Sequence, residues 1–367
     1  MFTIVLIITL VYAFVILSIA WGYYKLSKTT PNKTKNSKIS IVIAARDEEK
    51  NIEKCISSIV NQNFLTEHFE IIIVNDHSND KTVEIIDTLI KSNSNIRLLN
   101  LTDTYSKKEA IIVGVNLSKH SLIATTDADC ILPKNWLNTI SQVDYSNYSL
   151  LIGPLCLKDK KGFLNSFQQL DMFALQGITF GTVYYNLPTL CSAANLVFSK
   201  TDYLECSNKI NNKSPSGDDV FLMEQLLKKD KKIIGNLNRD FIVETEPENT
   251  FFDFLNQRIR WASKSKFYTN KPMIFLSILI FITNVVAIFI YSQIVFVDKN
   301  KAVYIILLLT KWLVDFILLF LVASFSNKKM KMINFIPVQI LYPIYILSTV
   351  FLSTFISFKW KGRVYNG

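Results

Sequence analysis

The chain has 367 residues, of which 50% are hydrophobic, with a mean hydropathy of +0.25 and a formal net charge of +10. This composition is too apolar for an ordinary soluble protein, and the apolar residues gather in blocks at the two ends around a centre of mixed polarity. The pattern predicts one soluble domain carried by membrane segments. Many lysines flank the apolar blocks, where they orient helices and attract anionic headgroups. Because the sequence has no zinc-finger, recognition-helix or arginine-rich pattern, we expect no nucleic-acid partner.

The N-terminal segment predicts a membrane anchor. Phe2–Ala20 is almost unbroken apolar sequence, and about 19 residues at ~1.5 Å each span the hydrocarbon core of a bilayer. A cleaved signal peptide is the alternative, but no Lys or Arg precedes the run, and the run is long for a signal. We expect a transmembrane anchor over residues 1–22 and a basic linker over 23–38, whose lysines put this side in the cytoplasm.

Strands and helices alternate from Ile39 onward, which predicts a parallel sheet with helices on both faces. The expected strands are Ile39–Ala45, Phe69–Val74, Ile96–Leu99 and Leu122–Thr125. Ligands of such sheets bind outside the carboxyl ends of the strands. Arg46, Asp76, Asp127 and Asp129 all follow strand ends, so we expect them to converge on one crevice.

Two carboxylates, Asp127 and Asp129, stand one residue apart directly after the fourth expected strand. In this position they can share one hard divalent cation, Mg²⁺ or Mn²⁺, whose shell substrate phosphates commonly complete. The alternative interpretation is a pair of loop acids that only turn the chain. We expect a metal site formed by Asp129 and Asp127.

From about Ile39 to Trp261 the chain resembles the family 2 glycosyltransferases. Ile39–Glu49 resembles the opening strand and arginine-asparagine-glutamate turn of that family, and Asn75–Asp80 resembles its aspartate-aspartate-glycine-serine nucleotide loop. Further similar motifs are Lys108 at a glycine-lysine-x-x-alanine helix start, Asp127–Asp129, Cys191–Lys200 with Asn195 retained, Asp218–Asp219, and the glutamine-x-x-arginine-tryptophan motif Gln257–Trp261. The chain departs from the family pattern at Asp47, Asn75, His77 and Lys107.

The resemblance implies an α/β GT-A fold, Rossmann-like with a mostly parallel sheet, in a cytoplasmic domain between N-terminal and C-terminal transmembrane helices. It implies a UDP- or GDP-sugar donor bound by Ala44, Arg46, Glu48, Asp76, Lys108 and Asp127. By its offset in the family motif, Asp219 is the expected catalytic base, with Asp218 beside it. Gln257, Arg260 and Trp261 are expected at the acceptor end of the site.

The C-terminal third is apolar again. We expect a glycosyltransferase domain over residues 39–250, an amphipathic interfacial helix with the glutamine-x-x-arginine-tryptophan motif over 251–271, a transmembrane region of two or three segments over 272–358, and a basic tail over 359–367. Asp315 lies inside an apolar segment and should face protein or water. Trp360–Tyr365 resembles a C-terminal signature of ceramide glucosyltransferases, which lies on the cytoplasmic side. Pro337 and Pro343 leave open whether the last segment crosses or re-enters.

These features predict a multi-pass inner-membrane inverting glycosyltransferase that moves a sugar to a lipid or lipid-linked acceptor at the cytoplasmic face. One alternative is a processive polysaccharide synthase, although the apolar segments are few for a pore. A nucleotidyl- or phosphoryl-transferring enzyme would need a phosphate loop, and the sequence has no glycine-rich one. A catalytically inactive lipid-binding scaffold is the last alternative. Retention of Asp76, Asp129, Asp219 and Arg260 together argues against it.

Overall fold

The computed structural model describes residues 2–31, 37–102, 105–207, 217–297 and 300–356, and the backbone of 358–360 and 363–365. The chain forms two compact units. The unit that we call the helical unit comprises Met1–Lys25, Asp159–Thr189 and Pro247–Gly367, and the sheet unit comprises Leu26–Lys158 and Leu190–Glu246. Of the predicted basic tail, residues 361, 362, 366 and 367 and all side chains lie outside what the structure describes.

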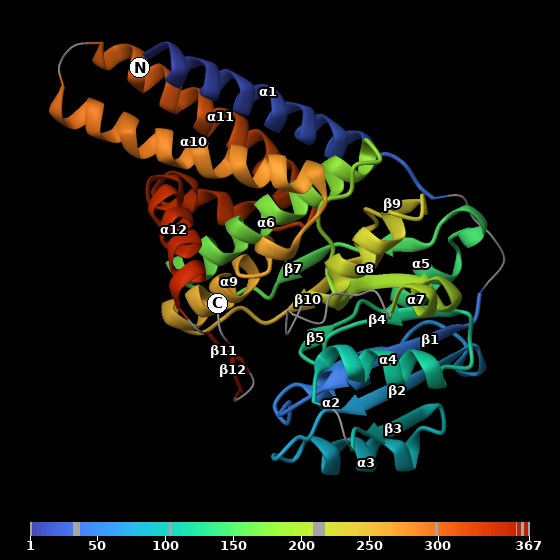
Figure 1. Ribbon diagram of the computed structural model, residues 1–367. Helices are drawn as coiled ribbons and strands as arrows, with labels where there is room; N and C mark the ends of the chain where they lie inside the picture. Colours follow the sequence, from blue (N-terminus) through green and yellow to red (C-terminus); the bar gives the residue numbers. More distant parts are fainter. Residues whose placement is uncertain are drawn as a thin grey trace. The chain divides into compact units, whose positions relative to one another are not determined.

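The sheet unit is built on a seven-stranded sheet in the order β3-β2-β1-β4-β8-β6-β9 (Figure 1). Its strands are β1 (Ile39–Ala45), β2 (Phe69–Asn75), β3 (Ile96–Asn100), β4 (Leu122–Thr125), β6 (Leu150–Ile152), β8 (Leu196–Ser199) and β9 (Ile233–Gly235). The strands β1 to β4 pair in parallel, as do β6 and β9, whereas β8 runs antiparallel to both of its neighbours. The predicted α/β class with a mostly parallel sheet is therefore confirmed.

Short helices and a second, three-stranded sheet complete the sheet unit. The helices are α2 (Ile52–Val60), α3 (Thr82–Ser92), α4 (Lys107–Leu117), α5 (Trp136–Ser141), α7 (Lys200–Ser207) and α8 (Asp218–Leu227), with single 3₁₀ turns at Thr66–His68, Tyr145–Asn147, Ala193–Asn195 and Arg239–Phe241. The second sheet has the order β5 (Cys130–Ile131), β10 (Val243–Thr245), β7 (Leu155–Leu157). Gly114 lets α4 approach β1 closely, because a Cβ atom there would lie 2.4 Å from Val42 Cγ1.

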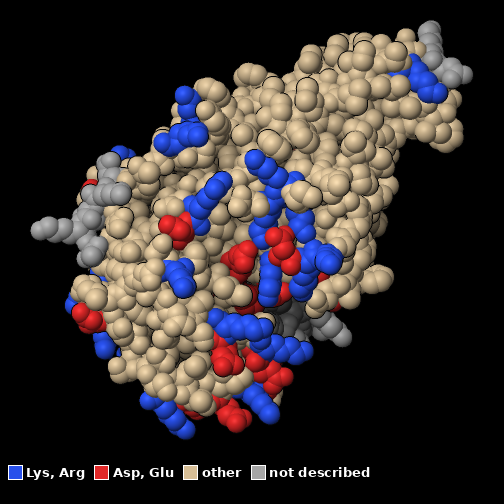
Figure 2. Space-filling view, turned by 180° about the vertical axis from the view of Figure 1, so that it is seen from behind, with Lys and Arg blue, Asp and Glu red and all other residues tan. Residues whose placement is uncertain are grey.

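The helical unit contains the long apolar helices. Its elements are α1 (Phe2–Leu26), α6 (Phe163–Tyr184), α9 (Phe251–Ala262), a 3₁₀ turn at Ser265–Phe267, α10 (Lys271–Phe296), α11 (Lys301–Phe325), the 3₁₀ segment η6 (Lys329–Asn334), α12 (Phe335–Phe355), and the hairpin of β11 (Phe358–Trp360) and β12 (Arg363–Tyr365). Within the described residues, four helices are long and apolar enough to cross a membrane: α1, α10, α11 and Lys329–Phe355. Figure 2 shows a large area of one face without any Lys, Arg, Asp or Glu side chain, as expected for helices that face lipid.

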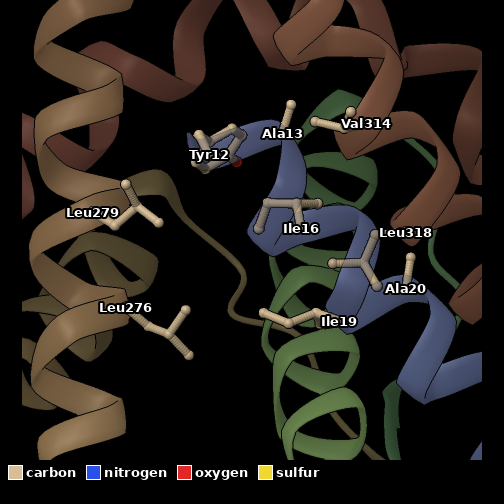
Figure 3. Close-up of a cluster of buried hydrophobic side chains, with 9 residues drawn as sticks. All are labelled: Tyr12, Ala13, Ile16, Ile19, Ala20, Leu276, Leu279, Val314 and Leu318. Atoms are coloured by element: carbon tan, nitrogen blue, oxygen red, sulfur yellow. The ribbon is translucent and has the colours of Figure 1, made fainter. Parts of the chain in front are cut away.

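Packing between these helices is close. Tyr12 and Ile16 of α1 meet Leu279 of α10 and Leu318 of α11 in one apolar cluster (Figure 3). The helices α1 and α6 approach even more closely, because a Cβ atom on Gly181 would lie 2.4 Å from the Ile19 carbonyl oxygen. Small residues that allow such approach are typical of helices that associate within a bilayer.

A polar cluster lies within the apolar helices. Asp315 Oδ1 accepts a hydrogen bond of 2.6 Å from the Tyr12 hydroxyl, and Asp315 Oδ2 pairs with Lys311 Nζ at 2.8 Å. Lys311 Nζ also donates to Gln339 Oε1 at 3.1 Å. Asp315 therefore faces protein, as predicted, and the cluster as a whole joins α1, α11 and α12.

Candidate active site

The loops after β1 and β2 are tied together by hydrogen bonds. The amide of Asp47 donates to Ser78 Oγ at 3.1 Å, and Asp47 Oδ1 accepts from the amide of Asn79 at 2.8 Å. The amide of Glu48 donates to Thr82 Oγ1 at 2.7 Å. Asp47 has a φ of 51° in the left-handed region, which aspartate tolerates better than most residues. The two loops therefore form one continuous edge at the carboxyl ends of the strands.

Arg46 and Asp76 meet at this edge, as predicted. Arg46 Nη1 donates to the Asp76 carbonyl oxygen at 2.8 Å and lies 3.8 Å from Asp76 Oδ1. Asp76 Oδ1 is 3.2 Å from His77 Nδ1, and the His77 ring stacks on Tyr105 with centroids 3.9 Å apart. Ala44 is beside them on β1, in register with Val74 of β2.

A lysine and three acids form the charged centre of the sheet unit. Lys107 Nζ pairs with Asp127 Oδ1 at 2.5 Å. Burial alone would lower the pKa of Lys107, but the carboxylates of Asp127, Asp218 and Asp219 outweigh it and raise that pKa. The connection after β4 and the N-termini of α4 and α8 therefore bring these four side chains into electrostatic reach of one another. Of the four, sequence reasoning missed Lys107.

The spacing between the lysine and the alanine of the family motif identifies Lys107. The motif lysine-x-x-alanine is met by Lys107 and Ala110, whereas the residue three places after Lys108 is Ile111. Ala110 is fully buried, in a cluster with Ile72 and Val74 of β2. Lys108 is partly buried in the same turn of α4.

Asp219 is fixed by two backbone amides. Its Oδ1 accepts from the amide of Val220 at 2.8 Å, and its Oδ2 accepts from the amide of Ala193 at 3.1 Å. Asp218 and Asp219 form the first turn of α8, where negative charge is favourable, and the preceding Gly217 has a φ of 96°. The second hydrogen bond joins Asp219 to the segment that resembles the family's acceptor loop.

Asn195 holds that segment in place. Its Oδ1 accepts from Trp136 Nε1 at 2.9 Å, and its Nδ2 donates to the carbonyl oxygens of Pro154 at 3.0 Å and Phe241 at 2.7 Å. The side chain is fully buried. Asn195 therefore hydrogen-bonds to three separate segments, two residues after the Ala193 amide that contacts Asp219.

The residues around Asp127 and Asp129 are compatible with a divalent cation. In the part of the chain that the structure describes, no three or more His, Cys, Asp or Glu side chains gather as a metal cluster. A Mg²⁺ or Mn²⁺ ion is commonly held by one or two carboxylates together with substrate phosphates and water, and this pair supplies such ligands. Burial, and then the charges of Asp129 and Asp127, raise the pKa of the Cys55 and Cys130 thiols.

The glutamine-x-x-arginine-tryptophan motif lies on α9 in the helical unit, whereas the acids belong to the sheet unit. Gln257 Nε2 donates to Glu248 Oε1 at 2.8 Å, and Gln257 Oε1 accepts from Arg258. The Arg258 guanidinium lies over the Trp261 ring, 4.1 Å from its centroid. Arg260 is partly buried on the same helix. Sequence reasoning did not identify Arg258.

Comparison with known proteins identifies the family to which the central part of the chain belongs. Residues 40–195 match the model of the family described as glycosyl transferase family 2. The chain carries a family 2 glycosyltransferase domain. The predicted family is therefore confirmed, and the match includes Arg46, Asp76, Lys107, Asp127 and Asp129.

The family 2 domain also has curated relatives. Glycosyltransferase GlyG of Streptococcus pneumoniae is 28% identical over 116 residues, which are 31% of this chain and 38% of that protein. Glycosyltransferase AglE of Haloferax volcanii is 26% identical over 99 residues, 27% of this chain and 33% of that protein. Poly-beta-1,6-N-acetyl-D-glucosamine synthase of Staphylococcus aureus is 30% identical over 97 residues, 26% of this chain and 23% of that protein. The chain thus spans between 23% and 38% of these relatives' lengths.

A solved structure resembles nearly the whole chain. It is the mannosyltransferase PcManGT from Pyrobaculum calidifontis in complex with GDP-Man and Mn²⁺. The TM-score is 0.64 at 12% sequence identity, and the alignment covers 96% of this chain and 98% of that one. At this identity the likeness concerns the fold alone. The predicted GT-A-type fold with apolar helices at both ends is confirmed.

Proposed function

We propose that the protein is a membrane-bound inverting glycosyltransferase. It moves a sugar from a UDP- or GDP-sugar to a lipid or lipid-linked acceptor at the cytoplasmic face of the cell membrane. The observation that carries the proposal is the charged cluster of Lys107 and Asp127, which lie within the residues that match the family 2 model, with Asp218 and Asp219 of α8. Among the residues that the structure describes, four helices are also apolar enough to cross a membrane.

The tied loops after β1 and β2 bind the nucleoside end of the donor in this proposal. Asp76 and Arg46 already hold each other through the hydrogen bond at 2.8 Å, so a nucleoside would meet groups that are fixed before it binds. Ala44 and Glu48 belong to the same edge, and Asp127 completes the donor site. Such preorganisation reduces the entropy lost on binding.

The diphosphate lies near the lysines that begin α4. Lys107 is a half-buried cation whose neighbouring carboxylates raise its pKa, so it carries its charge at neutral pH. Both Lys107 and Lys108 lie in the first turn of α4. Cations at this place stabilise the charge that develops on the leaving diphosphate.

Asp129 and Asp127 hold the divalent cation. When bound, a Mg²⁺ or Mn²⁺ ion neutralises charge on the diphosphate and helps to orient it. The solved mannosyltransferase of similar fold is described in complex with Mn²⁺, which supports a divalent ion in this fold.

Asp219 acts as the general base. Two backbone amides orient its carboxylate, which accepts the proton from the acceptor hydroxyl as that oxygen attacks the anomeric carbon. The new bond forms on the face opposite the diphosphate, whose bond to the sugar breaks, so the configuration inverts. Asp218, beside Lys107, keeps that cation in place.

Gln257, Arg260 and Trp261 serve the acceptor in this proposal. Their helix, α9, ends at Ala262, close in sequence to α10, which begins at Lys271 and is apolar enough to span the bilayer. A motif held this near a membrane helix lies at about headgroup depth. A lipid acceptor arrives there concentrated and partly oriented, which lowers the entropic part of the barrier.

A processive polysaccharide synthase is the second candidate, because one curated relative carries that description over 97 matched residues. The four candidate membrane helices among the described residues are few for a polymer channel. The length of the product separates the two functions. A single transferred sugar supports the lipid glycosyltransferase, and a polymer supports the synthase.

The test is a screen of UDP- and GDP-sugars for nucleotide release by the purified full-length protein, with and without a membrane lipid extract. We expect release from one donor and a clear increase with lipid. Release from no donor under any condition would contradict the proposed function.

A further inference from the structure

Arg258 and Asp171 form an ion pair inside the helical unit. Arg258 Nε lies 2.6 Å from Asp171 Oδ2, and the two side chains are only 6% and 5% exposed. The hydroxyls of Tyr342 and Tyr345 donate to Asp171 Oδ1 at 3.0 and 3.5 Å. Both oxygens of Asp171 are therefore satisfied by groups of α9 and α12.

Arg258 also holds two residues of the motif on α9. Its Nη1 donates to Gln257 Oε1, and its guanidinium lies over the Trp261 ring at 4.1 Å. The opposite amide group of Gln257 donates to Glu248 Oε1 at 2.8 Å, so this side chain is held at both ends. A planar guanidinium group with five N–H donors is needed to contact a carboxylate, an amide oxygen and an aromatic face at the same time.

A buried ion pair is a poor means of stabilising a protein. Replacing such a pair by apolar residues of similar volume is often neutral or stabilising, because two charges need not be desolvated. An apolar pair in place of Arg258 and Asp171 would fill the same space without a donor for Gln257. The pair is therefore better explained by the geometry that it imposes than by stability.

We propose that Arg258, anchored by Asp171, is a positioning residue that fixes Gln257 and Trp261 in the orientation that glycosyl transfer requires. This inference rests on the proposed function for its effect on turnover. Since Tyr342 and Tyr345 complete the anchor, the orientation of the motif depends on the last apolar helix, α12. Arg258 itself acts through its neighbours and is not assigned contact with the substrate.

The test compares Arg258→Lys, Asp171→Asn and the double variant Arg258→Met/Asp171→Leu with the wild-type protein. We expect the double variant to unfold near the wild-type temperature yet to turn over about 10²-fold more slowly, the scale of loss for misplaced groups. The lysine variant keeps the charge but not the fork of donors, so it should recover only part of the turnover. Full turnover in a stable double variant would overturn the proposal.

A matched control exists in a second ion pair of the helical unit whose two side chains are also buried. Lys311 and Asp315 are similarly buried, with side chains 5% and 11% exposed, and neither has a described contact with α9. We expect Lys311→Met/Asp315→Leu to keep turnover wherever it keeps the fold. An equal loss in this control would mean that any buried pair in this unit affects activity, and the positioning role would be withdrawn.

A second measurement separates this inference from the proposed function. The difference in tryptophan fluorescence between each protein and its Trp261→Phe counterpart reports on that ring alone. We expect acrylamide to quench Trp261 more strongly in the double variant than in the parent chain. Unchanged quenching would contradict the positioning role of Arg258, even if no sugar donor were found. A wild-type protein without any turnover would instead contradict the proposed function.

Discussion

Asp219 is the residue on which the proposed chemistry depends most. Asp219→Asn should lower turnover by ~10²–10⁴-fold, the usual loss for a missing general base, because the amide cannot accept the acceptor proton. Binding of the nucleotide sugar should change little, since the base acts on the acceptor. Steady-state turnover and donor binding by calorimetry test both statements.

The neighbouring acid provides the control for Asp219. Asp218 precedes it in the first turn of α8 and also contributes to the raised pKa of Lys107. We expect Asp218→Asn to weaken donor binding more than Asp219→Asn does. If Asp218→Asn removed turnover at unchanged donor binding, the base would be Asp218.

Glu70 connects β1, β2 and β3 in the sheet unit, and its stabilising effect depends on pH. Burial alone would raise its pKa, but hydrogen bonds from Ser40 and the Lys119 amide, and the Arg97 guanidinium, lower it overall. Because the pKa of Glu70 is lowered in the folded state, its ionised form stabilises the fold at pH values above the ordinary glutamate pKa of about 4.3. This stabilisation is lost as the pH falls through the folded-state pKa. Glu70→Gln should therefore lower the unfolding temperature at pH 7, and the difference should shrink in acid.

The exposed residue Glu67, three places earlier, gives the comparison for Glu70. Glu67→Gln should leave the unfolding temperature unchanged at both pH values. A Glu70→Gln difference that stayed constant down to pH 3 would show that the ionised form contributes nothing.

At the residue scale, the sequence predicted those site residues that occur in recognisable motifs. Arg46, Asp76 and Asp127 could be found because Arg46 and Asp76 directly follow a buried strand and Asp127 follows one after a single residue. Lys107 and Arg258 could not, since their roles depend on partners that are distant in sequence, Asp127 and Asp171. The lysine motif can be aligned on Lys107 or, one residue later, on Lys108. The prediction took Lys108, and both lysines stand in the same turn of α4.

At the element scale, the contact between α1 and α6 can be tested through two glycines. A Cβ atom on Gly181 would meet backbone of α1, the Ile19 carbonyl oxygen, at 2.4 Å. Gly181→Ala should therefore lower the free energy of unfolding by about 1–3 kcal/mol, the usual cost of overpacking. Thermal unfolding in detergent measures the change.

Gly177 is the matched position one turn earlier on α6. There a Cβ atom would meet only the Leu318 side chain, at 2.8 Å, which can move. Alanine also favours the helix over glycine by ~1 kcal/mol, so Gly177→Ala should cost less than Gly181→Ala. Equal losses would mean that α1 and α6 are not in close backbone contact.

The strands β1 to β4 were predicted within a residue or two because each is rich in apolar residues, and β1, β2 and β4 are buried at most positions. The helix α2 begins only at Ile52, since the preceding Arg46–Asn51 segment makes loop contacts with the β2 loop instead. The antiparallel strand β8 was not predicted. Its pairing with β4 joins Leu196 to Thr125, and such a register has no local signal in the sequence.

At the scale of the whole molecule, activity should require a divalent cation. Asp129→Asn should remove most turnover without changing the unfolding temperature, because a neutral amide is a poor ligand for Mg²⁺ or Mn²⁺. Turnover in the wild-type protein should stop in excess chelator and return when the cation is added back. Full turnover in chelator would rule out the metal role of Asp129 and Asp127.

The central claim is that a sugar leaves a nucleotide and joins a lipid. The most direct measurement gives the full-length protein radiolabelled UDP- and GDP-sugars together with a membrane lipid extract, and follows the label into the organic phase. We predict that label from one donor enters the lipid fraction with the wild-type protein and at least ~10²-fold more slowly with Asp219→Asn. Label that remained in the aqueous phase, or moved equally fast with both proteins, would contradict the account.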